Sequence, residues 1–145
     1  MPFGENPKSS KKSLYQIEDL SLLFYYSAVT KHRSKWPNYS KKQKMEILHT
    51  HCQKAFEIYI RQNIASSQRY WFKDQLEFDV IRETPGKKNN LDIIECKWSR
   101  LTKVQKDSIK QKIRNKYNQS PLYKNSLELN ISVCDQSNFY EFLKR

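Results

Sequence analysis

The middle of the chain contains two acidic residues and a lysine whose types and spacing could hold a divalent cation. Asp79 lies in an apolar-rich segment at 76–81, and Glu95 and Lys97 lie in a second such segment at 91–98. Because side chains alternate across a strand, Glu95 and Lys97 would point to the same face of a strand at 91–98. A lysine in that position could activate a water molecule or neutralise charge that develops on a phosphate.

The residues between these two segments predict an antiparallel hairpin. Residues 82–90 contain a proline and a glycine, which are typical of a turn between two strands. Strict alternation along the first strand predicts that Asp79 lies on the face opposite to Phe78 and Val80. The hairpin can then bring Asp79 close to Glu95.

Such a pair of acids predicts a metal site. Two carboxylates about 4 Å apart repel each other by about 4 kcal/mol at an effective dielectric constant of about 20. A hard divalent cation such as Mg²⁺ or Mn²⁺ offsets this repulsion, because it binds carboxylate oxygens and takes water at its remaining positions. We therefore expect Asp79 and Glu95 to bind Mg²⁺ or Mn²⁺.

The charge of the chain favours a polyanionic partner. The 145 residues include 27 Lys and Arg against 15 Asp and Glu, a formal net charge of +12. Such an excess attracts nucleic acid or an anionic membrane surface. The sequence has no apolar stretch long enough to span a membrane and no signal-peptide pattern. DNA is therefore the expected partner, with RNA left open, and a membrane is not expected.

The cysteines indicate the cellular compartment, and the small number of glycines excludes two nucleotide-binding motifs. Cys52, Cys96 and Cys134 are far apart in the sequence and lack metal-binding or disulfide spacing. They are expected to be small buried side chains in a reduced, cytoplasmic protein. The chain has two glycines, fewer than a Walker A loop or a dinucleotide-binding fingerprint requires.

Hydrophobic periodicity predicts the order helix, helix, three strands, helix, strand, helix. Residues 1–13 are expected to form a flexible basic lead-in. A first helical stretch at 14–30 has Asp19 as its cap, and Ser40 caps a long helix that runs to about residue 64. The remaining predicted elements are a strand at 70–72, a helix at 101–117, a strand at 127–134 and a helix at 137–144.

The helix predicted at 101–117 carries basic side chains that could guide a nucleic acid backbone. Its apolar side is formed by Ile109, Ile113 and Tyr117. Four basic residues follow one another at steps of three or four and are expected on the opposite face: Lys103, Lys106, Lys110 and Arg114. Contacts to phosphate oxygens are one interpretation of this face. An ordinary solvated helix face is the other.

The site segments resemble a known family. Asp79, the turn and then Glu95, Cys96 and Lys97 resemble the D…(D/E)-x-K signature of the PD-(D/E)XK nuclease superfamily. The resemblance implies an α/β (α+β) fold with a restriction-endonuclease-like core, in which a mixed sheet of about four strands is flanked by helices. It implies a single domain over residues 14–145, with a helical extension at 14–40 and the core at 41–145.

The same resemblance implies roles for individual residues. Asp79, Glu95 and the backbone carbonyl of Cys96 would hold the metal ion, and Lys97 would activate water. Glu57, in the predicted helix before the hairpin, falls where many members of the superfamily place an additional acidic residue. The alternative for Glu57 is a partly buried acid paired with a lysine or a backbone donor. The implied activity is metal-dependent hydrolysis of DNA phosphodiester bonds.

A second resemblance extends over most of the chain up to Trp98. The segments LYQIEDLSLLFYY, AFEIYIRQNI, LEFDVI and IIECKWS resemble the C-terminal, DUF234-type nuclease-like domain of prokaryotic and archaeal AAA-type ATPases, here without the ATPase part. An ATPase acting in trans and a homodimer are the partners that this implies. Two alternatives to an enzyme stay open: a catalytically silent module that binds nucleic acid or a partner protein, and a truncated remnant of an ATPase.

Overall fold

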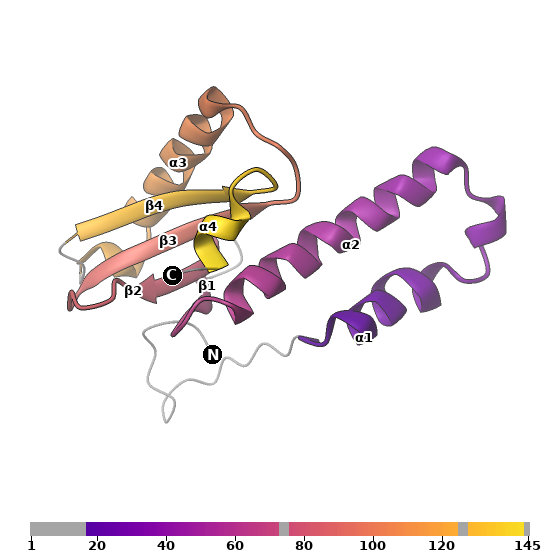
Figure 1. The fold of residues 1–145 in the computed structure, drawn as a ribbon, viewed down its shortest axis with the longest axis horizontal. Helices are drawn as coiled ribbons and strands as arrows, with labels where there is room; N and C mark the ends of the chain where they lie inside the picture. Colours follow the sequence, from indigo (N-terminus) through magenta and orange to yellow (C-terminus); the bar gives the residue numbers. More distant parts are fainter. Residues whose placement is uncertain (1–16, 73–75, 125–127, 144–145) are drawn as a thin grey trace.

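The computed structural model describes residues 17–72, 76–124 and 128–143, so the lead-in expected at 1–13 lies outside the described residues. Four strands form one mixed sheet in the order β1-β2-β3-β4, and helices flank it on both faces (Figure 1). The strands are β1 (Gln68–Phe72), β2 (Leu76–Glu83), β3 (Asn90–Lys97) and β4 (Glu128–Asp135). The helices are α1 (Leu20–Phe24), α2 (Lys41–Gln62), α3 (Lys103–Asn118) and α4 (Phe139–Leu143). The predicted element order and the four-stranded mixed sheet are therefore confirmed.

Local signals in the sequence set the starts of the two long helices. Ser40 caps α2 by accepting a hydrogen bond from the backbone N–H of Gln43, whose side chain bonds back to the backbone N–H of Ser40. Thr102 and Gln105 form the same reciprocal box at the start of α3. These boxes satisfy backbone donors that a helix N-terminus otherwise leaves without partners.

The connections between strands decide the topology of the sheet. β1, β2 and β3 pair in an antiparallel manner, whereas β3 and β4 pair in parallel from Asn90↔Glu128 to Lys97↔Asp135. A parallel pair needs a long crossover, which α3 and the short helix η3 (Pro121–Lys124) supply.

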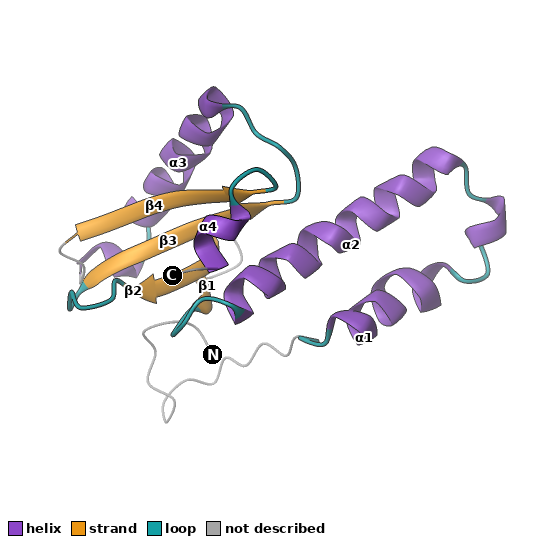
Figure 2. Cartoon of the chain, in the orientation of Figure 1, coloured by secondary structure: helices purple, strands orange, loops and turns teal. Residues whose placement is uncertain are grey.

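Two apolar clusters of buried side chains pack the helices against the sheet, and Figure 2 shows these helices around the strands. One packs α2 and α4 against the sheet and consists of buried Phe56, Ile60, Ile64, Val80, Ile94, Cys96, Cys134 and Phe142. The other packs α3 against the opposite face and consists of buried Tyr70, Phe78, Ile81, Leu91, Ile93, Ile113 and Tyr117. Cys96 and Cys134 are fully buried, as expected for small apolar side chains, whereas Cys52 is only half-buried, so the expectation for it is wrong.

The clusters show that the alternation expected along β2 is wrong around Asp79. Phe78 packs on the α3 side of the sheet and Val80 on the α2 side, although alternation predicts the same side for both. The reason is a bulge: Tyr70 of β1 lies opposite Phe78, but Gln68 lies opposite Ile81. Two residues of β2, Asp79 and Val80, therefore lie opposite one residue of β1, Arg69. The extra residue in β2 turns Val80 to the face of the sheet opposite to that of Phe78.

The first helices form an arm that extends away from the sheet (Figure 1). The arm comprises α1, a π-helical segment η1 (Tyr25–Thr30), a 3₁₀ turn η2 (Trp36–Asn38) and the N-terminal half of α2. Asp19 caps α1 as predicted, but α1 begins at Leu20 and continues into η1 instead of forming one helix. Within the part of the chain that the structure describes, no helix is both long and apolar enough to cross a membrane.

Candidate functional site

The candidate site lies where β2 and β3 separate. Their pairing runs from Glu83↔Leu91 as far as Val80↔Ile94. Beyond this point β2 pairs with β1 through Phe78, while the end of β3 stays paired with β4. We call the place where the strands part, next to Asp79, the fork. Strand backbone that faces the fork has lost its neighbour and needs other hydrogen-bond partners.

Side chains take the place of β2 in the fork. Asp79 accepts the backbone N–H of Cys96 through Oδ2 at 2.9 Å. Gln53, from α2, donates its Nε2 to the Cys96 carbonyl at 2.9 Å and accepts the Trp98 N–H at 2.7 Å. The backbone of Cys96 is therefore held by one carboxylate and one amide, and both point into the same fork.

Glu57 is tied to this arrangement through Gln53. The two residues are one turn apart on α2, and Gln53 Nε2 donates to Glu57 Oε1 at 2.6 Å. Phe56 and Ile60, on either side of Glu57 in the sequence, are buried in the cluster beneath α2 and fix the rotation of the helix. The structure thus brings Glu57 to the edge of the fork, bonded to an amide rather than to a lysine.

Lys97 and Glu95 form a direct pair at the end of β3. Lys97 Nζ lies 2.7 Å from Glu95 Oε1, and the Glu95 side chain is 13% exposed. The Lys97 side chain is 37% exposed, so its ammonium remains accessible to a ligand. The expected proximity of these two side chains on one strand is therefore present.

The carboxyl groups of Asp79, Glu95 and Glu57 gather around Lys97, and Arg61 donates to the backbone carbonyl of Asp79 at 3.2 Å. Desolvation, together with the nearby carboxylates of Glu95 and Glu57, raises the pKa of Asp79 to about 8. Desolvation also raises the pKa of Glu57. Burial acts to lower the pKa of Lys97, but its hydrogen bond to Glu95 and the charges of the acids outweigh burial and raise it. A further cation at the fork would stabilise the ionised form of Asp79.

The oxygen atoms at the fork fit a hard cation better than a soft one. No group of three or more His, Cys, Asp or Glu side chains that could hold a metal ion occurs among residues 17–72, 76–124 and 128–143. A cation would therefore depend on the carboxylates of Asp79 and Glu95, the Cys96 carbonyl and water. Magnesium commonly binds through one or two carboxylates and keeps several waters, so donors of this chemical type could hold Mg²⁺.

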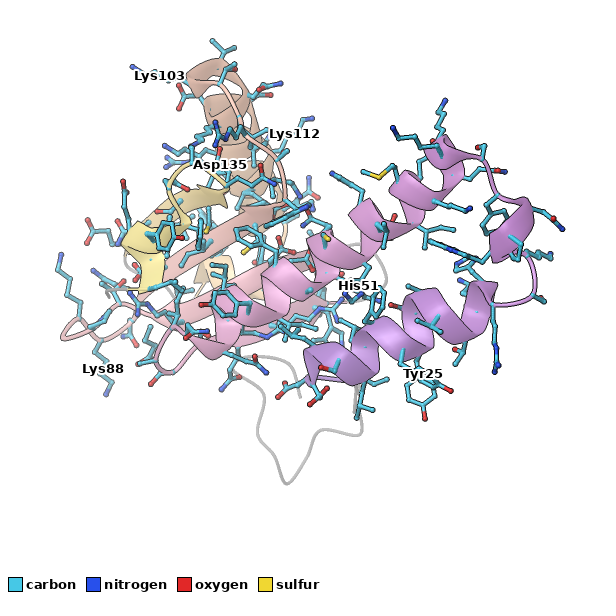
Figure 3. The ribbon with its side chains drawn as sticks, turned by 45° about the vertical axis from the view of Figure 1, so that its right-hand side comes forward. Tyr25, His51, Lys88, Lys103, Lys112 and Asp135 are labelled. Carbon is cyan, nitrogen blue, oxygen red and sulfur yellow. The ribbon has the colours of Figure 1, made fainter. Side chains whose placement is uncertain are left out.

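The basic residues predicted on α3 do not all lie on an open face. Lys106 is half-buried, and its Nζ pairs with Oδ1 of the fully buried Asp135 at 3.0 Å. The expectation that Lys106 lies opposite the apolar side of α3 is therefore wrong. It comes three residues before Ile109 and seven before Ile113, so it lies at the edge of their side of the helix. Lys103, Lys110 and Arg114 are exposed, and Lys103 is at the N-terminal end of α3 (Figure 3).

Two residues with clear roles at the site were not predicted from the sequence. Gln53 contacts Glu57, Cys96 and Trp98, and the available signal was its position four residues before Glu57 on a predicted helix. Asp135 receives hydrogen bonds from the Leu101 N–H and from Ser137, and it fixes the loop that follows β3. The sequence gives a weaker indication for Asp135, because an acidic residue at the end of a strand is common and does not by itself indicate a role.

Comparison with known proteins gives no match: no protein-family model, no curated protein and no solved structure corresponds to the chain. The geometry of the fork and the distribution of charge around it are therefore what bears on function.

Proposed function

We propose that the protein is a nuclease-like domain of the PD-(D/E)XK type that hydrolyses DNA phosphodiester bonds with Mg²⁺ or Mn²⁺. One observation carries the proposal: a desolvated carboxylate, Asp79, is bonded to the strand segment that holds Glu95 and Lys97. A site of this kind combines oxygen donors for a hard cation with a lysine that is accessible from solvent.

Each residue has a separate task in this proposal. Asp79 and Glu95, with the Cys96 carbonyl, hold the cation. A divalent cation supplies a Lewis acid for the phosphate and lowers the pKa of water to a range useful near neutral pH. Lys97 orients the attacking water and balances the charge that builds up on the phosphate. Glu57 positions Gln53, whose amide orients the Cys96 carbonyl.

The exposed lysines and arginine of α3 would hold the DNA backbone along this helix. Lys103, Lys110 and Arg114 are seven and four residues apart, so they share one stripe of α3. Lys103 is at the end of α3 that follows β3, and Arg114 lies beside the groove lined by Arg82 and Asp92. Lys110 also lies 3.8 Å from Asp107, an exposed pair that salt screens and that a phosphate can replace. Their contacts with phosphate oxygens would position the substrate without reading its sequence.

The direct test is cleavage of plasmid and linear DNA by the purified chain. We expect cleavage with Mg²⁺ or Mn²⁺ and none with EDTA. Lys97→Met should lower the rate by about 100-fold or more, because it removes a group that acts on the transition state. Asp79→Asn and Glu95→Gln should abolish cleavage. Lys112→Met, an exposed change on α3 outside the site, serves as the control for preparation and folding.

A contaminating nuclease would cleave equally in all of these variants, and that outcome would remove the enzymatic proposal. A second candidate is then a module of the same fold that binds nucleic acid without cleaving it. One observation favours it: the Cys96 carbonyl already accepts a hydrogen bond from Gln53, which leaves it less available to a cation. DNA binding by Asp79→Asn in the absence of cleavage by the wild-type protein would support this candidate.

A further inference from the structure

A second concentration of positive charge lies at the tip of the arm. Residues 31–45 contain six basic residues and no Asp or Glu. These residues are Lys31, Arg33, Lys35, Lys41, Lys42 and Lys44. They surround the turn between η1 and α2, which includes η2. We refer to them as the arm-tip cluster.

The arm-tip cluster is open to a ligand. All of its members except Lys44 are exposed, and Lys44 is half-buried with its Nζ 5.7 Å from the centre of the Trp36 ring. None of the six forms an ion pair with a residue that the structure describes. Basic residues of the sheet behave differently, since Arg69, Arg82 and Lys97 each pair with a carboxylate. The charge at the arm tip is therefore not balanced within the described part of the protein.

Helix stability does not account for this charge. Lysines at the start of α2 oppose the positive end of the helix dipole, which favours acidic side chains. The first turn of α2 has no acidic residue, and its capping box uses the neutral Gln43 where Glu would serve equally well. The start of α3 has the same features, with Lys103 in the first turn and Gln105 in the box. Both helices thus begin with uncompensated positive charge.

The surface beside the cluster has polar groups suited to a phosphate backbone. A groove of about 460 Å³ between η1 and α2 is lined by Lys31, His32, Gln43, Thr50 and Lys54, and by a single acid, Glu46. Trp36 and Tyr39 are half-buried next to it, and the Tyr39 hydroxyl lies 3.2 Å from His32 Nδ1. Lysine, imidazole, amide and hydroxyl groups are the donors that contact phosphate and sugar in nucleic acid complexes.

The arm tip and α3 lie on either side of the end of β3, and the N-terminal ends of both α2 and α3 are at the upper side of the view in Figure 1. Lys103 is likewise at the top of α3 in Figure 3. Lys42 and Glu57 lie about 22 Å apart along α2, given a rise of about 1.5 Å per residue. That length corresponds to about six base pairs of duplex at about 3.4 Å each. A duplex that is centred on the fork and runs along α2 would therefore reach the arm-tip cluster.

We propose that the arm-tip cluster binds the phosphate backbone of duplex DNA, about half a helical turn from the fork, while α3 contacts the duplex on the other side. This inference deepens the proposed function, because it describes how the same substrate is held. It concerns binding, however, and not the cleavage step. The arm-tip cluster then sets the minimum length of duplex that binds tightly.

The test compares two double charge reversals that change the net charge equally. Lys41→Glu/Lys42→Glu alters the arm tip, and Lys87→Glu/Lys88→Glu alters the turn between β2 and β3, where Lys88 points away from the arm (Figure 3). Binding of a fluorescently labelled 24-base-pair duplex is followed by anisotropy in EDTA over a range of salt concentrations. Acidic residues at the start of α2 suit the helix dipole, so the arm variant should fold, which its thermal melt checks.

We expect the arm variant to bind at least about tenfold more weakly than wild type at about 0.1 M salt. The slope of log affinity against log salt should become less steep by about 1.8, which corresponds to two lost phosphate contacts. The turn variant should stay within about twofold of wild type if phosphate contacts, rather than net charge, carry the affinity. Shortening the duplex to 8 base pairs should remove the difference between wild type and the arm variant.

Equal affinities of the arm and turn variants would overturn the inference. Binding of wild type to vesicles of phosphatidylserine and phosphatidylcholine, without binding to the duplex, would also overturn it. If wild type binds the duplex through the arm but cleaves nothing with Mg²⁺ or Mn²⁺, the inference stands and the proposed hydrolysis fails. If cleavage depends on Asp79 and the arm variant binds like wild type, the hydrolysis stands and the inference fails.

Discussion

The carboxylate of Asp79 accepts the backbone N–H of Cys96 at 2.9 Å, at the point where β2 has stopped pairing with β3. This bond replaces a strand–strand hydrogen bond with one from a side chain. It holds an acid in a desolvated position beside Glu95, where its ionisation is unfavourable. The fold therefore keeps a group whose charge lowers stability, which is typical of positions that serve a function.

The first prediction concerns the pH dependence of stability without metal. The pKa of Asp79 is about 8 in the folded protein and 3.8 ordinarily, so the folded state binds this proton more tightly. Stability should therefore fall as pH rises from about 4 to about 8. Asp79→Asn retains an oxygen for the Cys96 N–H and cannot ionise. In EDTA, its free energy of unfolding relative to wild type should rise by about 1–3 kcal/mol between pH 5 and pH 8.5.

Urea denaturation at the two pH values measures this difference. Asp107→Asn, on the exposed side of α3, is the matched control and should show a change below about 0.5 kcal/mol. If Asp79→Asn is less stable than wild type at pH 8.5, the ionised carboxylate stabilises the fold. The assignment of Asp79 to a metal site would then be withdrawn.

Much of the fold could be predicted from the sequence because its signals are local. Ser40 and Asp19 cap helices with their own side chains, and these bonds need no distant partner. The hairpin around residues 82–90 follows from a turn between two apolar segments. The juxtaposition of Glu95 and Lys97 follows from strand alternation alone, and the structure has the two in contact at 2.7 Å.

The remaining features depend on contacts between distant segments. The bulge at Asp79 arises from how β1 pairs with β2, and residues 76–81 by themselves suggest a regular strand. Gln53 is 43 residues from Cys96, and its role depends on where α2 crosses the fork. Lys106 is turned toward Asp135 because α3 packs on β4, whereas its spacing in the sequence is compatible with either side of the helix.

The second prediction concerns Gln53. Gln53→Ala leaves the Trp98 N–H and the Cys96 carbonyl without their present partners, which should lower the free energy of unfolding by about 1–3 kcal/mol. Gln53→Glu can still accept the Trp98 N–H but adds a negative charge next to Glu57, so it should be more harmful at pH 8 than at pH 5. Gln111→Ala is the control, because Gln111 bonds Asn115 on the exposed side of α3 and should cost about 0.5 kcal/mol or less. Equal effects of the changes at Gln53 and Gln111 would show that the amide does not hold the fork.

The third prediction concerns the loop that follows β3. Burial opposes ionisation of Asp135, but hydrogen bonds from Ser137, the Leu101 N–H and Lys106 outweigh it and lower its pKa to about 2. The stabilisation is therefore fully present above the ordinary value of 3.8 and is lost as pH falls through about 2. Asp135→Asn should destabilise the protein by about 2–4 kcal/mol at pH 7. The difference should shrink below pH 4, and a constant difference down to pH 2.5 would contradict the role given to the charge.

The last prediction concerns metal binding in the absence of DNA. A ligand that binds the folded state alone stabilises it by about 2.7 kcal/mol when present at about 100 times its dissociation constant. A gain of this size should raise the Tm by about 5–10 °C for a domain of this length. We expect Mn²⁺ to raise the Tm of wild type. The rise should be smaller at pH 5.5 than at higher pH, because the proton of Asp79 competes with the cation. Asp79→Asn and Glu95→Gln should lose the shift, whereas Lys112→Met should keep it. A shift of the same size in wild type and all three variants would mean that Mn²⁺ binds elsewhere, and the fork would then not be a metal site.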